Sequence, residues 1–173
     1  LSMGGYILMN AAYRYSERIS AIVLSDTQCN ADSPKMREER AKTTALINSE
    51  GLKTFAEGFM GNIFCSESID KKKELVEQIR NVIISTSPLT IIGTLHALAL
   101  RYQMCPSLKE ITVPTLILCG KEDKITPLSQ SEYMLKSITN STMQSIDKAG
   151  HLSNLEQPAE FNKHLENFIT RIA

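Results

Sequence analysis

The sequence predicts an α/β fold in which a parallel sheet is interrupted by a separate helical segment. Three short apolar runs, at residues 19–24, 115–119 and 141–146, are typical of strands buried on both faces. The stretch of roughly 80 residues between the first two runs shows helix signals and no convincing strand, which is too long for an ordinary crossover connection. We therefore expect a core formed by residues 1–29 and 106–173, and a helical lid formed by residues 30–105.

The helices of the core are predicted from apolar residues at helical spacing. The first is expected from Gly4 to about Tyr15, directly before the first apolar run. Two more are expected at residues 127–138 and 158–172, each after a further strand. This alternation of strands and helices favours a parallel sheet with helices packed on it.

Four helix signals divide the inserted segment. Ser33-Pro34 places a capping residue before a proline suited to the first helical position, and Gly51 should end that helix after about residue 49. Apolar stripes predict helices around residues 52–60 and 75–83, the latter with Ser68 as a candidate cap, and Ser87-Pro88 begins the fourth. The apolar side chains that could line a pocket, or equally well pack these helices together, are Phe55, Phe59, Met60, Leu95 and Leu98.

Composition excludes several classes of function. The chain has 173 residues, of which 42% are hydrophobic and 22% charged, as in a folded domain. Because 19 basic and 19 acidic residues give zero formal net charge, neither nucleic acid nor an anionic membrane is indicated as a partner. No apolar run approaches the roughly 20 residues that cross a bilayer, and a signal peptide pattern is absent from the first residues. We therefore expect a cytoplasmic location.

The four cysteines are Cys29, Cys65, Cys105 and Cys119. They lie far apart and form no C-x-x-C pair, so the sequence indicates neither a zinc site nor a redox motif. Unpaired cysteines commonly behave as small buried hydrophobic residues. We expect all four to be buried free thiols.

A serine, an acid and a histidine occur beside glycines along the chain. The chain opens on Ser2-Met3-Gly4-Gly5, and Gly120-Lys121-Glu122-Asp123 and Gly150-His151 follow downstream. A serine hydroxyl is a poor nucleophile at neutral pH unless a histidine takes its proton and a carboxylate orients that histidine. Ser2, Asp123 and His151 are therefore the candidate catalytic residues.

The acid has alternatives in Glu122, Asp26 and Asp147. We favour Asp123 because it lies three residues past the glycine that ends an apolar run, where a loop can present a carboxylate to a histidine from the next strand. Asp26 is the second choice, because it lies just past the end of the first apolar run.

The serine and the histidine also have alternatives. Ser2 could be an ordinary helix N-cap. His151 is the one histidine of three that follows a glycine in a loop after a predicted strand. His96 and His164 fall inside helix patterns, where packing or surface roles are expected, although His96 could line a pocket.

The first residues resemble a nucleophile elbow, G-x-S-x-G, with Leu1 at the first x and no leading glycine or strand. Gly4 fits the requirement that a flanking position carries no side chain. The backbone N–H of Met3, at the first turn of a helix, would be one donor to an oxyanion, and the second donor is expected from a loop upstream of Leu1. We therefore interpret the chain as the C-terminal part of a larger enzyme.

With these motifs the chain resembles the α/β-hydrolase superfamily over essentially its whole length. The run from Val113 to Gly120 with Asp123 resembles the strand and loop of the acid, and Ala149-Gly150-His151-Leu152 resembles the histidine loop. The run from Gly150 to Pro158 and the Met-Gly-Gly elbow are most similar to 3-oxoadipate enol-lactonases and related small carboxylic ester hydrolases. This resemblance implies a serine esterase or lactonase with a Ser-His-Asp triad, a helical lid and no cofactor or metal.

The resemblance also implies a small-molecule ester or lactone substrate, with Arg101 as a candidate ligand for a substrate carboxylate or, alternatively, an exposed arginine. The same fold serves non-catalytic ligand receptors, and the chain by itself could be an inactive fragment. Finally, the first strand should have an unpaired edge, which favours self-association.

Overall fold

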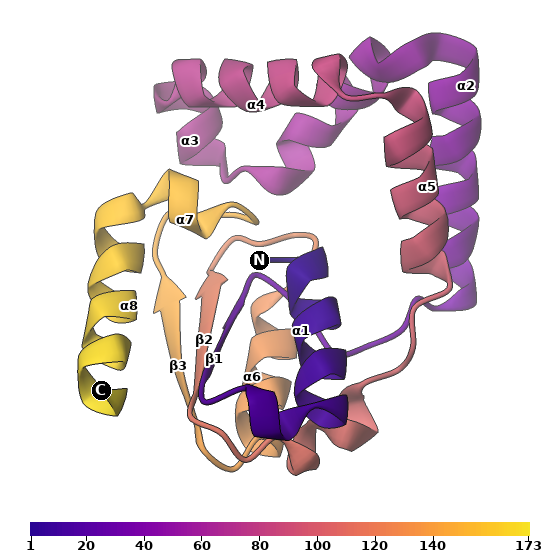
Figure 1. Cartoon of the computed structure of the whole chain (residues 1–173). Helices are drawn as coiled ribbons and strands as arrows, with labels where there is room; N and C mark the ends of the chain where they lie inside the picture. Colours follow the sequence, from indigo (N-terminus) through magenta and orange to yellow (C-terminus); the bar gives the residue numbers. More distant parts are fainter.

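The computed structural model describes residues 1–173 and contains a three-stranded parallel sheet in the order β1-β2-β3 (Figure 1). β1 (Ile22–Ser25) pairs with β2 (Thr115–Gly120), and β2 pairs with β3 (Ser141–Ile146). The predicted α/β class is confirmed. β1 has a strand partner on one side only, and self-association through its other edge stays a prediction.

Helices cover both faces of the sheet. α1 (Met3–Arg14) and α6 (Leu128–Ser137) lie on one face, and α8 (Pro158–Ile172) lies on the other (Figure 1). The central strand β2 is buried at all six positions, because successive side chains of a strand point to opposite faces and each face has a helical layer. Ile117 packs with side chains of α1 and α6, whereas Leu116 and Leu118 pack with Phe168 of α8.

Short elements complete the core: η1 (Ser16–Arg18), η2 (Cys105–Glu110) and α7 (Ser153–Glu156). The first strand is shorter than predicted, since η1 precedes it and regular pairing with β2 begins only at Ile22. Apolar character at Ile19 reflects packing against the core cluster rather than strand pairing.

The inserted segment forms four helices that lie beyond the carboxyl ends of the strands (Figure 1). They are α2 (Pro34–Ile63), α3 (Ser66–Lys71), α4 (Lys73–Ser85) and α5 (Pro88–Ala99). α2 is interrupted at Gly51, whose φ of 81° is a conformation that glycine adopts without steric cost. The predicted cap at Ser33 is confirmed, because its side chain accepts a hydrogen bond from the Met36 N–H. The predicted cap at Ser68 is wrong, since Ser68 lies within α3, which Cys65 caps.

No residue of α4 or α5 is fully buried. The apolar side of α4 packs on Met60 and Ile63 in the last turn of α2 and on Phe64, which follows α2. No helix of the chain is by itself long and apolar enough to span a membrane; α4 and α5 reach that length and composition only when counted together, and they are bent by 95°.

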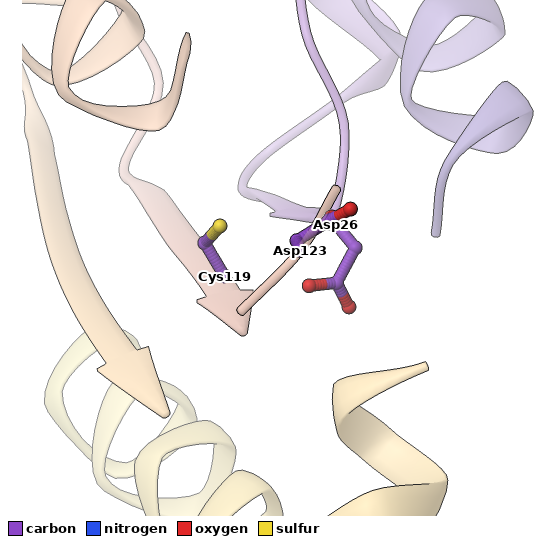
Figure 2. A group of neighbouring side chains, drawn as sticks. All are labelled: Asp26, Cys119 and Asp123. Carbon is purple, nitrogen blue, oxygen red and sulfur yellow. The ribbon is translucent and has the colours of Figure 1, made fainter. Parts of the chain in front are cut away.

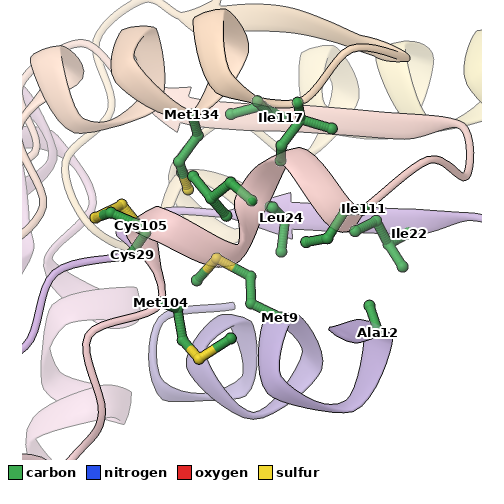
Figure 3. Packing of buried hydrophobic residues seen from close by; sticks show 12 residues of the cluster. Met9, Ala12, Ile22, Leu24, Cys29, Met104, Cys105, Ile111, Ile117 and Met134 are labelled. Atoms are coloured by element: carbon green, nitrogen blue, oxygen red, sulfur yellow. A yellow bond between two sulfur atoms is a disulfide. The ribbon is translucent and has the colours of Figure 1, made fainter. Parts of the chain in front are cut away.

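Cys29 and Cys105 form a disulfide bond inside the core cluster (Figure 3). The expectation of four free thiols is therefore wrong for this pair, and it holds for Cys65 and Cys119, which are buried and unpaired. The two bonded residues flank the inserted segment and have Cα atoms 4.8 Å apart despite a sequence separation of 76. The bond thus joins the two chain segments that connect the inserted helices to the core.

Candidate active site

Ser2, His151 and Asp123 are joined by hydrogen bonds near the carboxyl ends of the strands. Oγ of Ser2 lies 2.8 Å from Nε2 of His151, and Nδ1 of His151 lies 2.9 Å from Oδ2 of Asp123. The imidazole and the carboxylate belong to residues that are each only 5% exposed. Three distant parts of the chain therefore form one continuous hydrogen-bonded relay, in which Nε2 of His151 lies where it can accept the proton of the serine hydroxyl.

Ser2 occupies a strained turn at the start of α1. Its φ of 48° and ψ of −117° are unusual for a residue with a side chain. Two backbone contacts hold it there: its N–H donates to the Ser25 carbonyl at 2.9 Å, and its carbonyl accepts the Thr27 hydroxyl at 2.8 Å. Ser2 occupies the N-cap position of α1, but its side chain makes no capping hydrogen bond and contacts His151 instead.

The glycines after Ser2 differ from expectation in their roles. A Cβ at Gly4 would meet no atom within 4 Å, whereas a Cβ at Gly5 would lie 2.3 Å from Oγ1 of Thr27. The steric requirement that we assigned to Gly4 therefore falls on Gly5. Met3 begins α1, so its N–H has no acceptor within the helix and can donate to a ligand beside Ser2.

The loop after β2 holds the Asp123 carboxylate in place through hydrogen bonds. Its Oδ1 accepts the N–H groups of Ile125 and Thr126 at 2.8 and 2.9 Å, and its Oδ2 accepts the Thr126 hydroxyl at 2.7 Å. Burial by itself would raise the pKa of Asp123, but the hydrogen bond and charge of His151, together with Thr126, hold that pKa below its ordinary value. Asp123 is therefore ionised at neutral pH and can stabilise an imidazolium.

The loop after β3 holds His151 against the inserted segment. The His151 N–H donates to the Ile63 carbonyl at 2.8 Å. The buried carboxylate of Glu156 accepts the Gly150 N–H at 2.7 Å and the Cys65 N–H at 2.9 Å. A Cβ at Gly150 would lie 2.8 Å from the Cys65 nitrogen, so this backbone contact requires glycine.

Asp26, our second choice for the acid, lies beside Asp123 and is not bonded to the imidazole (Figure 2). Its fully buried carboxylate accepts the Gly120 N–H at 2.9 Å and the hydroxyls of Ser153 and Ser25 at 2.6 and 3.0 Å. Burial raises the pKa of Asp26 to about 6, against the hydrogen bonds from Ser153 and Gly120, and the charge of Asp123 adds to the rise.

The remaining candidate acids and histidines take no part in the relay. Glu122 is exposed, and Asp147 forms an ion pair with Lys121. His96 is exposed on α5, and His164 is half-buried on α8.

Asp26, Cys119 and Asp123 gather closely enough to be considered as metal ligands (Figure 2). All four carboxylate oxygens, however, already accept hydrogen bonds from protein donors. Burial also raises the pKa of the Cys119 thiol, which keeps it protonated and a poor ligand. The arrangement fits two carboxylates that each accept hydrogen bonds from other protein groups better than it fits a metal site.

A cavity of about 300 Å³ opens beside Met3, between α1 and the end of α5. Its walls are mostly apolar and consist of Met3, Tyr6, Ile7, Asn10, Ala97, Leu98, Arg101, Tyr102 and Met104. Of the six candidate pocket residues, Leu98 and Arg101 line this cavity.

The other four lie elsewhere in the inserted segment. Phe55 and Phe59 stack on each other with ring centroids 5.1 Å apart, and Met60 packs with Ile63 and Phe64. Leu95 is half-buried on α5, outside the cavity walls.

Arg101 is a buried cation, not the exposed arginine of the alternative. Its side chain is 8% exposed, pairs with Asp32 at 2.6 Å and lies 4.4 Å over the Tyr6 ring. Its Nε donates to the Asn30 carbonyl, and its Nη2 has no hydrogen-bond partner. This nitrogen is therefore both unpaired and shielded from solvent.

Four side chains that support the site were not singled out in the sequence: Thr27, Thr126, Ser153 and Glu156. Thr126 could have been found, because a Ser or Thr shortly after an Asp often shares hydrogen bonds with it in a turn. The others act across the fold and leave no local pattern.

The layered sheet and the serine–histidine–aspartate arrangement at its strand ends place the protein in the α/β-hydrolase superfamily. Within it, the chain belongs to the Ndr family, which matches residues 1–172.

Several hydrolases are similar to the chain. It is 26% identical over 171 residues to 3-oxoadipate enol-lactonase 2 of Acinetobacter baylyi, covering 99% of this chain and 62% of that protein. A thermophilic esterase from Thermogutta terrifontis, solved with malate bound, superposes with a TM-score of 0.93 at 30% identity, over 99% of this chain and 63% of the esterase. The enol-lactonase from Burkholderia xenovorans superposes with a TM-score of 0.89 at 24% identity, over 98% of this chain and 64% of the lactonase. The chain thus spans less than two thirds of each of these proteins.

Proposed function

We propose that Ser2, His151 and Asp123 are the catalytic triad of a serine hydrolase that cleaves a small carboxylic ester or lactone. The observation that carries the proposal is the unbroken hydrogen-bonded relay, with contacts of 2.8 and 2.9 Å. The similarity to proteins named enol-lactonase and esterase supports the substrate class.

The reaction begins when Oγ of Ser2 attacks the substrate carbonyl and Nε2 of His151 takes its proton. The ionised Asp123 stabilises the imidazolium, and the Met3 N–H donates to the tetrahedral oxyanion. Loss of one such donor typically costs about 100-fold to 1000-fold in rate. The imidazolium then protonates the leaving alkoxide, and a water molecule deprotonated by His151 releases the acid from Ser2. Protein groups and water supply every proton in this sequence, so it needs no cofactor.

The inserted helices act in this proposal as a lid that shapes the substrate cavity. Leu98 of α5 forms part of the apolar wall of the cavity. Arg101, just after α5, adds one positive charge, and its Nη2 has no hydrogen-bond partner. Such a cavity suits a small acyl group, and a carboxylate on the substrate could reach Arg101. The binding of malate, a dicarboxylate, to the similar esterase agrees with this suggestion.

The test is a hydrolysis screen with short p-nitrophenyl esters and five-membered lactones. We expect turnover of at least one compound by the unmodified protein, its loss in Ser2→Ala, and its retention in the control Ser16→Ala, which changes an exposed serine of η1. Turnover that persists in Ser2→Ala, or no turnover of either class, would contradict the proposal.

A further inference from the structure

The last residue of β1 and the segment that follows it both contact the backbone of the nucleophile. The Ser25 carbonyl accepts the Ser2 N–H, and the Thr27 hydroxyl donates to the Ser2 carbonyl. The Thr27 side chain also occupies the space that a Cβ on Gly5 would need. The strained turn at Ser2 is therefore held in place by the residues immediately before and after Asp26.

The carboxylate of Asp26 reaches the loops of the other two triad members. Its Oδ1 accepts the N–H of Gly120, three residues before Asp123. Its Oδ2 accepts the hydroxyl of Ser153, two residues after His151. One buried side chain thus connects the acid loop to the histidine loop, and its own backbone neighbours hold the serine.

We propose that Asp26 is a positioning residue that aligns His151 and Asp123 with Ser2. The inference rests on the proposed function, because it concerns the same relay. It adds a role for a carboxylate that touches neither the imidazole nor the serine hydroxyl.

The surroundings of Asp26 fit this role. Asp26 has a φ of 45°, which Asp tolerates better than most residues and which persists only where neighbouring contacts enforce it. An ionised carboxylate accepts at both oxygens, whereas an amide would place an NH₂ group against one of the donors. The Gly120 N–H cannot turn away, but the hydroxyls of Ser25 and Ser153 can reverse their hydrogen bonds. A carboxylate therefore accepts from all three donors as they stand, whereas Asn could keep the three contacts only with both hydroxyls reversed.

Two buried serines provide a matched test. Ser153→Ala and Ser25→Ala each remove one hydroxyl donor from the same oxygen of Asp26, and only Ser153 adjoins the histidine loop, at the start of α7. We expect the rate of inactivation by a fluorophosphonate to fall about tenfold further in Ser153→Ala than in Ser25→Ala, since small displacements of reacting groups are costly. Equal rates in the two variants, compared at equal folded fractions, would overturn the proposal.

Substitution of Asp26 itself gives the second measurement. We expect Asp26→Ala to lower kcat for the best ester about 100-fold with little change in KM, and Asp26→Asn to restore part of this loss by keeping the Gly120 contact. An unchanged kcat in Asp26→Ala would overturn the inference. If Asp26→Ala does not fold, the comparison of Ser153→Ala with Ser25→Ala tests the proposal instead.

The two proposals fail in different ways. If the fluorophosphonate does not label Ser2, the proposed function is wrong. Normal labelling at Ser2, with Ser153→Ala indistinguishable from Ser25→Ala, removes only the role of Asp26.

Discussion

The strand ends and the inserted helices contribute to the site in different ways. At the strand ends, Asp26, Asp123 and His151 are almost fully buried and every carboxylate oxygen has a partner. In the insert, α4 and α5 bury no residue completely, although α5 contains no Asp, Glu, Lys or Arg. We infer that the sheet sets the geometry of the reacting groups, while the insert shapes the cavity beside them.

The two regions meet at the junction between α2 and α3. There the Ile63 carbonyl and the Cys65 N–H contact the histidine loop, directly and through Glu156. Changes at the strand ends should therefore affect rate and stability strongly, and changes in the insert should act mainly on substrate affinity.

The largest effect is expected from His151→Ala, which removes the proposed general base. We expect kcat to fall by about 10⁴-fold or more, because the serine loses its proton acceptor. The control is His164→Ala on α8, which leaves the relay intact. Steady-state kinetics with the best ester measure both variants, and a His151→Ala enzyme within tenfold of the original would contradict the assignment.

The disulfide bond tests how firmly the insert is tied to the core. For the loop closed between Cys29 and Cys105, chain entropy predicts a stabilisation of about 4 kcal/mol. Urea unfolding of the double variant Cys29→Ala/Cys105→Ala should show this loss. Reductant should destabilise the original protein and leave the double variant unaffected; no effect on either would show that the bond contributes nothing.

Substituting one glycine in each region compares how closely the strand ends and the inserted helices are packed. A Cβ at Gly120 would lie 2.1 Å from the Gly150 carbonyl oxygen, whereas a Cβ at Gly93 in α5 meets nothing within 4 Å. Gly120→Ala should therefore lower the free energy of unfolding by about 3 kcal/mol. Gly93→Ala should raise it by up to about 1 kcal/mol through helix propensity. Similar values for both variants would remove the contrast between the regions.

Asp26 should make stability depend on pH in a defined window. Because its pKa rises from 3.8 unfolded to about 6 folded, the folded state binds the proton more tightly. Stability therefore falls as pH rises from about 4 to about 6, by about 3 kcal/mol from this group. Asp123, whose pKa is lowered, titrates below this window. Urea unfolding of Asp26→Asn between these pH values should lack this fall; parallel curves for both proteins would contradict it.

The smallest effect is expected in the cavity wall. Leu98 lines the cavity and Leu95 on the same helix does not. Leu98→Ala should raise KM about fivefold to tenfold with kcat nearly unchanged, since it removes apolar contact with the substrate. Leu95→Ala should change KM less, and the reverse order would show that the substrate binds elsewhere.

The sheet could be predicted because its strands are short apolar runs between segments with helical spacing. Such runs are typical of strands buried on both faces, and β2 is buried at every position. The break at Gly51 was also readable, since glycine alone suits that backbone. The start of β1 was not, because apolar Ile19 packs on the core without joining the sheet.

Contacts across the fold were harder to predict. Spacing in the sequence does not reveal which cysteines meet, so the bond between Cys29 and Cys105 was missed. Ser2, Asp123 and His151 could be proposed from their order and neighbouring glycines. Leu98 and Arg101 were also candidates, but they could not be separated from Phe59, because a helical apolar stripe does not tell whether a side chain faces a cavity or another helix.

Mass spectrometric mapping of a fluorophosphonate adduct tests most directly whether His151 activates Ser2. We predict one adduct, on Ser2, that is absent from Ser2→Ala and forms far more slowly in His151→Ala. An adduct on another residue, or one that persists in Ser2→Ala, would contradict this account.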